Sequence, residues 1–158
     1  MEIRLPIHIR PAIAEDIPQM GTLFRSVIET VCSKDYAPGQ LAAWASSSGD
    51  LHRWQKLLAE TEMIVAEANE GKMAGFAALR HPAHIEMMYT DKDFQGRGVA
   101  GCLLKELLGK TSGPVTVHAS RTARPFFEKH GFVVAEELFP VRNGIVIPNF
   151  RMVKGGCQ

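Results

Sequence analysis

The chain has 158 residues, of which 46% are hydrophobic and 22% charged, a composition typical of folded globular proteins rather than disordered, collagen-like or coiled-coil ones. At this length we expect a single domain over residues 1–158 with a core that needs no disulfide. Lys and Arg number 18 against 17 Asp and Glu, which gives a net charge of +1. Nucleic-acid-binding proteins normally carry a strong basic excess, so we expect no nucleic-acid partner.

The cysteines and the N-terminal residues indicate in which cellular compartment the protein is expected. Cys32, Cys102 and Cys157 form neither a CxxC pair nor a metal-ligand spacing, so we expect free thiols in a reducing cytoplasm and no metal site. Residues 1–12 lack the apolar segment of a signal peptide, and no apolar run approaches the roughly 18 residues of a membrane span. We therefore expect a cytoplasmic protein without a membrane partner.

The first part of the chain is predicted to form one strand and three helices. Apolar and polar residues alternate over residues 3–10, the period of a strand, and Pro6 favours an edge position or a late start. Apolar residues then recur at helical spacing, which predicts helices over residues 17–31, 40–46 and 51–58.

The remainder is predicted to form strands separated by two helices. Because Asn-Gly suits a type I′ turn, Asn143 and Gly144 predict a late hairpin whose second strand covers residues 145–153. Further strands are predicted over residues 63–68, 73–80, 84–90, 115–119 and from 132 onward, and helices over 98–110 and 122–130. This order predicts an α/β protein with a mixed sheet.

The turn between the strand at 84–90 and the next helix carries three glycines, Gly96, Gly98 and Gly101. Such glycines let the backbone approach a ligand closely, and the unpaired N–H groups at a helix start attract anions. The pattern predicts a bound phosphate or pyrophosphate, although a tight turn with close packing would use the same residues. There is no P-loop, and a dinucleotide site would need an acidic ribose-binding residue that is missing here.

Residues 95–100, Gln-Gly-Arg-Gly-Val-Ala, resemble the Q/R-x-x-G-x-G/A signature of the GNAT superfamily, the acetyl-CoA-dependent N-acetyltransferases. Residues 123–132 resemble a second family segment, A-x-x-F-Y-x-x-x-G-F, and residues 9–17 resemble the family's first strand and helix. The three elements follow in the family's order. The resemblance implies a mixed, mostly antiparallel, twisted sheet with flanking helices and splayed central strands.

The resemblance also implies that acetyl-CoA is the acetyl donor. Its pyrophosphate would lie on the backbone N–H groups of the glycine turn, and its pantetheine arm would pair with the end of the strand at 84–90. Arg121 and Arg124 would be available to the adenosine phosphates, unless they are solvated surface charges. The residues implied in donor binding are Met88, Tyr89, Thr90, Gln95, Gly96, Arg97, Gly98, Val99, Ala100, Gly101, Ser120, Arg124 and Phe127.

Direct transfer of an acetyl group to an amine, which we expect in a ternary complex, needs a group that takes the proton of the amine. Glu86 and His84 are the candidates: two apart on one strand, they would share a face, with Ile85 and Met87 on the other. Glu86 is the better candidate, since apolar surroundings can raise the pKa of a carboxylate toward the useful range. His84 could act through a water molecule, and water alone is a third option.

The proton donor and the acceptor stay open. Many family members have Tyr where this chain has Phe127, so the donor to the leaving thiolate is missing or displaced, although a thiolate can leave unassisted. We expect the acceptor pocket between the early helices and the late hairpin, with Tyr36 as a candidate substrate contact. Small amines, antibiotic-like polyamines, amino acids and protein N-termini all remain candidate acceptors. A homodimer is also possible. The alternative function is a non-catalytic acyl-CoA-binding or interaction module of the same fold.

Overall fold

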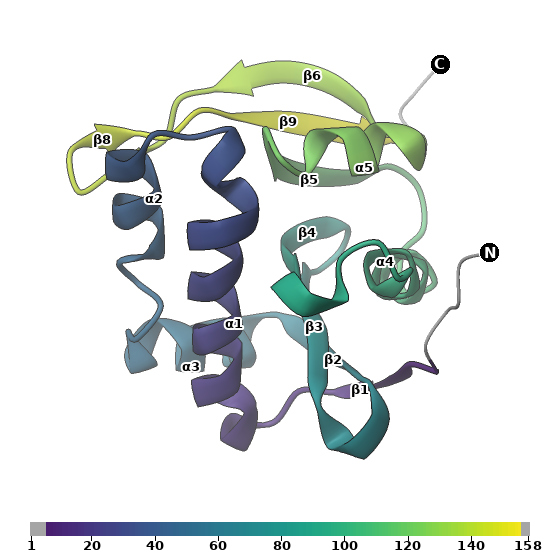
Figure 1. Cartoon of the computed structure of the whole chain (residues 1–158). Coiled ribbons are helices and arrows are strands. Elements are labelled where there is room, and N and C mark those ends of the chain that lie inside the picture. The colour runs from purple at the N-terminus through teal and green to yellow at the C-terminus, as the bar shows by residue number, and fades with distance from the viewer. Residues whose placement is uncertain (1–5, 156–158) are drawn as a thin grey trace.

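Within the described residues, seven strands form the main sheet, in the spatial order β1 (His8–Pro11), β2 (Glu62–Glu67), β3 (Met73–Arg80), β4 (His84–Thr90), β5 (Val115–Ser120), β9 (Asn149–Lys154) and β6 (Val133–Leu138) (Figure 1). The structure is a computed structural model that describes residues 6–155, so the predicted strand residues 3–5 lie outside the described part. Every neighbouring pair of strands is antiparallel except β4 and β5, which are parallel. The predicted mixed, mostly antiparallel sheet is confirmed.

Helices cover both faces of this sheet (Figure 1). One face packs against α1 (Ile17–Thr30), α2 (Pro38–Ala45) and α3 (Leu51–Glu60), and the other against α4 (Val99–Leu108) and α5 (Arg124–Lys129). The helices lie where the apolar spacing predicts them, with ends that differ by one to two residues in most cases, as helix ends commonly do.

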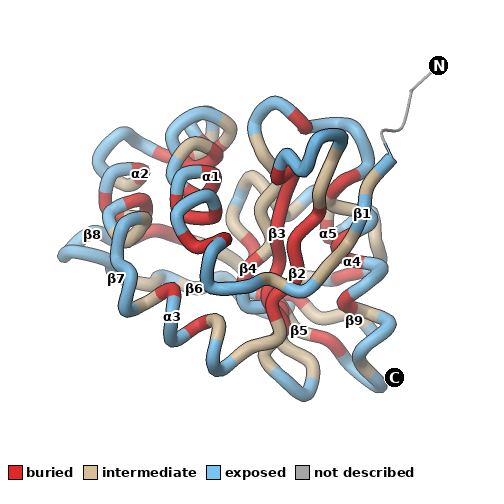
Figure 2. Tube along the Cα trace, turned by 90° about the horizontal axis from the view of Figure 1, so that it is seen from below, coloured by how far each residue is buried: buried red, intermediate tan, exposed pale blue. Residues whose placement is uncertain are grey.

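Two apolar cores form because β2 and β3 are apolar on both faces and both faces are covered. The core under α1–α3 has an aromatic centre, in which the Trp54 ring meets Phe24 at 5.6 Å and Phe76 at 5.7 Å between centroids. The core under α4 is filled by leucines such as Leu103 and Leu107, both 0% exposed. Figure 2 shows buried residues along β2 and β3. The centre of the sheet is therefore a rigid support for β4.

The parallel strands β4 and β5 separate soon after they meet. Only two residue pairs join them, His84 with Thr116 and Ile85 with Val117. From residue 86 to residue 90, β4 has a strand partner on its β3 side alone among the described residues. This divergence confirms the predicted splay of the central strands and opens one edge of β4.

A β-bulge interrupts β4 at Glu86. Ala78 of β3 faces Met87, but the next residue, Leu79, faces Ile85, so Glu86 is the additional residue on the bulged strand. Ile85 consequently packs in the core under α4, whereas Met87 packs in the core under α1–α3. The prediction that Ile85 and Met87 share a face is wrong, because it assumed an uninterrupted alternation along the strand.

The late hairpin consists of β7 (Val141–Arg142) and β8 (Ile145–Val146), joined by the predicted turn, where Asn143 and Gly144 have φ of 49° and 75°. The predicted continuous strand over 145–153 is wrong. Pairing with β7 stops at Val146, and β9 begins only after Pro148, which has no N–H to donate. β9 then inserts between β5 and β6 in the main sheet.

A partly buried ion pair joins β1 to the start of α1. The terminal nitrogens Nη1 and Nη2 of Arg10 each lie 2.8 Å from the Asp16 carboxylate, and Arg10 Nε lies 2.9 Å from Glu67 on β2. Asp16 also accepts the Ile13 N–H at 2.8 Å. The hydrogen bonds from Arg10 hold the pKa of Asp16 below its ordinary value, although burial opposes this.

We expect Asp16→Asn to lower the free energy of unfolding at neutral pH by about 1–3 kcal/mol, because charge-assisted hydrogen bonds to a buried group are lost. The folded-state pKa of Asp16 is depressed, so its contribution is present above the unfolded-state pKa and disappears as the pH falls through the folded-state pKa. Urea unfolding at neutral and acidic pH checks this. The exposed pair Arg25–Glu29 is the control, since Glu29→Gln should cost less than about 0.5 kcal/mol.

Candidate active site

A cleft of about 1240 Å³ opens where β4 and β5 diverge. Its walls are β4, the glycine turn with the start of α4, the end of β5 with α5, and residues of the α1–α3 layer and the late hairpin. The predicted site residues that line it are Tyr36, His84, Glu86, Met88, Tyr89, Thr90, Gln95, Gly96, Gly98, Val99, Ala100, Gly101, Ser120 and Phe127. Two others, Arg97 and Arg124, lie outside these walls.

The glycine turn has the backbone geometry that an anion site needs. Gly96 and Gly98 have φ of 72° and 82°, in the left-handed region that side chains disfavour, and α4 starts directly after Gly98. The first hydrogen bond of the helix runs from the Cys102 N–H to the Gly98 carbonyl, so the N–H groups before Cys102 are not used by the helix. The Gln95 amide donates to the Thr90 carbonyl at 2.8 Å and fixes the turn against the end of β4.

Space and charge around this turn fit an anionic ligand. A Cβ added at Gly96 or Gly101 would meet no atom within 4 Å, so the surface beside the turn is open. Lys105 of α4 and Lys129 of α5 both line the cleft. Together with the positive end of the α4 dipole, these cations favour an anionic ligand in the cleft.

The two arginines predicted near the adenosine phosphates are engaged elsewhere. Arg124 lies 3.3 Å from Glu128 and stacks over the Phe150 ring at 4.7 Å. Arg121 donates to the Asp35 carbonyl at 3.3 Å. Their contact with a donor molecule stays a prediction, and it would require these side chains to leave their present partners.

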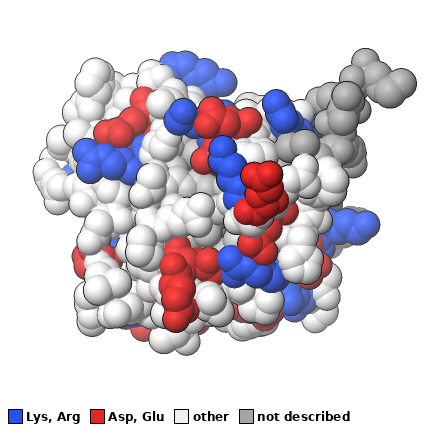
Figure 3. Space-filling view, turned by 60° about the horizontal axis from the view of Figure 1, so that its bottom comes forward, with Lys and Arg blue, Asp and Glu red and all other residues white. Residues whose placement is uncertain are grey.

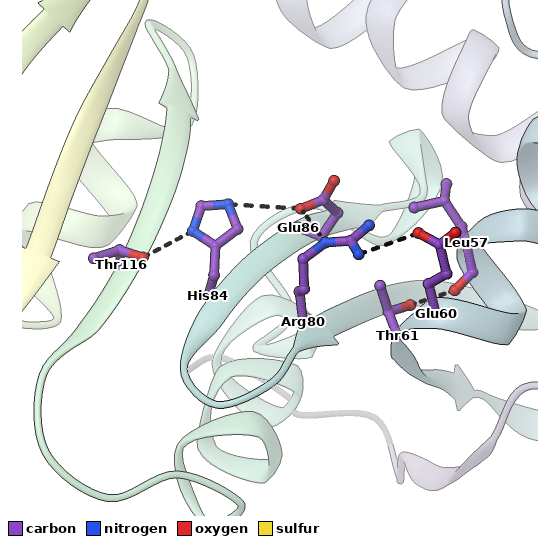
Figure 4. Close-up of polar contacts among 7 residues, drawn as sticks. All are labelled: Leu57, Glu60, Thr61, Arg80, His84, Glu86 and Thr116. Atoms are coloured by element: carbon purple, nitrogen blue, oxygen red, sulfur yellow. Dashed lines mark hydrogen bonds and ion pairs between the residues drawn. The ribbon is translucent and has the colours of Figure 1, made fainter.

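Glu86 and His84 face each other across the bulge in β4 (Figure 4). The Glu86 carboxylate lies 3.6 Å from His84 Nε2 and 3.3 Å from Arg80 Nε, and His84 Nδ1 hydrogen-bonds the Thr116 hydroxyl on β5 at 2.8 Å. Arg80 in turn reaches Glu60 of α3 at 3.3 Å. The bulge thus brings the two predicted catalytic side chains together. Glu86 stands among charged groups rather than in the apolar surroundings that the sequence suggested.

The electrostatics of His84 suit a proton acceptor. Burial lowers the pKa of His84, and the neighbouring His118 ring, 4.9 Å away between centroids, lowers it further. Glu86 opposes these effects. The lowered pKa favours the neutral form of His84, which can accept a proton beside the carboxylate.

The hydroxyl of Tyr36, the predicted substrate contact, is fully used by the protein. It donates to the Pro148 carbonyl at 2.6 Å and accepts the Arg121 N–H at 2.9 Å, while the ring packs against Trp44 at 5.4 Å. Tyr36 thus ties the segment before α2 to the ends of β5 and β9. What it offers the cleft is the ring, not the hydroxyl.

Two further predicted site residues, Ser120 on β5 and Tyr89 on β4, also have structural partners. The Ser120 hydroxyl accepts the Ala123 N–H at 3.0 Å, and Tyr89 packs against Phe24 at 5.0 Å between ring centroids. Burial raises the pKa of Tyr89, so its phenol stays protonated. Both residues nevertheless line the cleft and stay candidates for donor contact.

Several cleft residues were not singled out as site residues from the sequence: Cys32, Arg53, Lys105, His118, Lys129 and Arg142. A charged residue on an amphipathic helix is normally solvated, and nothing local in the sequence distinguishes Arg53 or Lys105 from that case. Arg53, on a predicted early helix, and Arg142, next to the Asn-Gly turn of the late hairpin, do lie in segments predicted to border the acceptor pocket.

The outer surface carries mixed charge. On the face in Figure 3, Lys and Arg side chains are interspersed with Asp and Glu, and uncharged residues cover much of the area. Within residues 6–155, no helix is both long and apolar enough to cross a membrane. The same residues include no group of three His, Cys, Asp or Glu side chains arranged to hold a metal ion.

The splayed sheet, the glycine turn and the cleft between them define an acetyltransferase of the GNAT class. The family model described as "Acetyltransferase (GNAT) domain" matches residues 32–154. The chain therefore belongs to the GNAT acetyltransferases, and the family and enzyme class predicted from the sequence are confirmed.

Individual relatives agree with this assignment. The chain is 34% identical over 146 residues to the "Uncharacterized N-acetyltransferase YafP" of Escherichia coli (strain K12), covering 92% of this chain and 94% of that protein. A GCN5-related N-acetyltransferase from Rhodopseudomonas palustris, also titled "Aminotransferase, Class-II", has a similar crystal structure, with 30% identity, a TM-score of 0.93, and coverage of 98% and 99% of the two chains. The PaiA N-acetyltransferase of Thermoplasma acidophilum, crystallised with coenzyme A, shares the fold at 17% identity, with a TM-score of 0.75 and coverage of 96% and 99%.

Proposed function

We propose that this acetyltransferase moves an acetyl group from acetyl-CoA directly to a primary amine of a small-molecule or peptide acceptor. The observation that carries the proposal is the cleft itself, which joins the glycine turn to the Glu86–His84 pair. The CoA complex of a protein with the same fold supports a CoA site in this architecture.

The residues present fit the proposed donor at several points. The N–H groups from Gly96 to Gly101 would hold its pyrophosphate, with Lys105 and Lys129 on the walls of the same cleft. The open edge of β4 from Met88 to Thr90 would pair with the amide groups of its pantetheine arm, as an added strand would. Bound there, acetyl-CoA supplies the acetyl thioester.

The protein's part in the transfer is to position the reactants and to handle one proton. Glu86 and His84 take a proton from the ammonium form of the acceptor, which makes its nitrogen nucleophilic. Backbone N–H groups of β4 near Met88 stabilise the negative charge that develops on the carbonyl oxygen of the acetyl thioester. Holding two reactants in one cleft contributes much of the acceleration, since effective molarities of about 10⁵–10⁸ M are reached in well-oriented systems.

The donor site is tested with Gly98→Val. We expect acetyl-CoA to raise the melting temperature of the wild-type protein, because a ligand that binds only the folded state stabilises it. In Gly98→Val the φ of 82° is strained and a branched side chain obstructs the turn, so CoA affinity should fall by at least about tenfold. The matched control is Gly113→Val, where the same kind of glycine, with φ of 77°, lies outside the cleft walls.

Two results would contradict these assignments. Unchanged CoA affinity in a folded Gly98→Val protein would show that the turn is not the anion site. CoA release measured with a thiol reagent tests the transfer itself, against a panel of primary amines. Tight CoA binding with no transfer to any amine of the panel would count against the proposed function.

A further inference from the structure

Arg53 is a half-buried cation on the wall of the cleft. It lies in the first turn of α3, and its guanidinium is 5.6 Å from the Phe24 ring centroid and 5.9 Å from that of Trp54. Its Nη1 donates to the Ser47 hydroxyl at 2.9 Å. These contacts fix the flat guanidinium in place and leave donor groups free for another partner, since a guanidinium has five N–H donors.

Arg53 has no paired carboxylate within residues 6–155, whereas five other arginines do. The arginines that have one, at 2.8–3.3 Å, are Arg10, Arg25, Arg80, Arg124 and Arg151. The Asp50 carboxylate caps α3 by accepting a hydrogen bond from the backbone N–H of Arg53 at 3.2 Å, so its recorded contact is with the backbone and not with the guanidinium. A partly buried charge without a counterion is costly to keep, and an anionic ligand would remove that cost.

A second cation from a distant part of the chain faces the same cleft. Arg142 lies on β7 of the late hairpin and lines the cleft together with Arg53. Burial lowers the pKa of Arg53, and the positive charge of Arg142 lowers it further, so the two charges act on each other. Asp50, Glu86 and the Tyr89 phenol oppose this only in part.

The cleft therefore carries a carboxylate on one strand of the sheet and two arginines on other elements. Glu86 and His84 lie on β4, whereas Arg53 and Arg142 belong to α3 and the late hairpin, and apolar side chains such as Val27 and Ile147 also line the cleft. The donor phosphates are accounted for by the glycine turn with Lys105 and Lys129. The arginine pair is left for the acceptor.

We propose that the acceptor is an amine that also carries an oxyanion group, a carboxylate or a phosphonate, and that Arg53 binds this group with help from Arg142. This inference rests on the proposed function, since it names the substrate class of that same cleft. An amino acid is the simplest molecule of this kind. Arginine suits the task because its planar fork can donate two parallel hydrogen bonds to such a group.

The test is a comparison of kcat/KM for matched acceptors. One series contains α-, β- and γ-amino acids, the second their carboxamides and the third the corresponding aminophosphonates, with rates compared per fraction of neutral amine. We expect at least one acid or phosphonate to exceed its carboxamide by about tenfold or more in the wild-type protein. The carboxylate and phosphonate series then distinguish the two sources of the charge.

Variants locate the recognition at Arg53. In Arg53→Gln the ratio of acid to carboxamide should fall to about one, mainly through KM, and Arg53→Lys should restore part of it because the charge returns without the fork. Arg142→Gln should reduce the ratio less, since Arg142 is exposed. Arg25→Gln, an exposed arginine of α1 outside the cleft walls, is the matched control and should keep the wild-type ratio. The CoA-induced thermal shift shows that each variant is folded.

The outcomes separate this inference from the proposed function. Transfer to carboxamides and acids at equal rates, or a wild-type ratio in folded Arg53→Gln, would overturn the inference and leave the proposed function intact. Transfer to no amine would count against the proposed function. In that case the inference is still tested by binding: at least one acid or phosphonate of the series should raise the melting temperature of the wild-type CoA complex but not that of Arg53→Gln, and no shift with any of them would overturn it.

Discussion

Glu86→Gln is expected to lower kcat/KM for amine acetylation at neutral pH by about 100-fold or more, with little change in CoA affinity. General-base groups contribute about 10²–10⁴-fold, and glutamine keeps the shape of the side chain but cannot accept the proton. Glu86 faces the cleft and holds Arg80 and His84 within 3.6 Å. The loss should be largest where the acceptor is mostly protonated. Initial rates across the pH range, with CoA affinity measured separately, check this.

The pairing around Arg80 offers a matched control for this variant. Glu60 lies 3.3 Å from Arg80, as Glu86 does, but on α3 and outside the cleft walls. Glu60→Gln therefore removes an equivalent ion pair without removing a base, and we expect nearly wild-type turnover. A wild-type rate in Glu86→Gln across the pH range would mean that His84 or water, and not Glu86, accepts the proton. If His84 is the acceptor, the acidic limb of the rate profile should lie below its ordinary pKa of 6.5, because burial lowers that pKa.

The parts of the fold that sequence alone predicted are those that depend on neighbouring residues. Apolar spacing located the helices, and the Asn143–Gly144 pair identified a turn that has positive φ at both positions. The glycines at 96 and 98 likewise identified the turn before α4, where both have positive φ. Each signal is local, since backbone conformation at a turn depends mainly on the residues in it.

The parts that sequence could not give depend on distant partners. The bulge at Glu86 arises from the register of β4 against β3, and a pattern of alternating residues in β4 does not contain that register. Tyr36 bonds Pro148, which is 112 residues away. The Arg53 guanidinium lies over the Phe24 ring, which belongs to another helix. These contacts decide which side chains meet in the cleft.

Phe127→Ala is expected to lower the free energy of unfolding by about 3–5 kcal/mol, because it opens a cavity in the core under α4. Phe127 is 3% exposed and meets the Phe126 and Phe132 rings at 5.2 and 5.1 Å between centroids. Phe132, 2% exposed in the same core but outside the cleft walls, is the matched control. Phe132→Ala should cost about as much stability. In the milder leucine variants, only Phe127→Leu should also weaken CoA binding, as measured by denaturant unfolding and CoA titration.

Phe127→Tyr separates packing from chemistry at the same position. The ring lines the cleft, and a hydroxyl added toward the cleft would sit where a leaving thiolate could use a proton donor. We expect this variant to keep its stability within about 1 kcal/mol, since the volume barely changes, and to retain at least wild-type turnover. Loss of transfer in a stably folded Phe127→Tyr protein would mean that the ring packs tightly against donor or acceptor. The proton-donor position implied by the family resemblance would then have to be sought at another residue of the cleft.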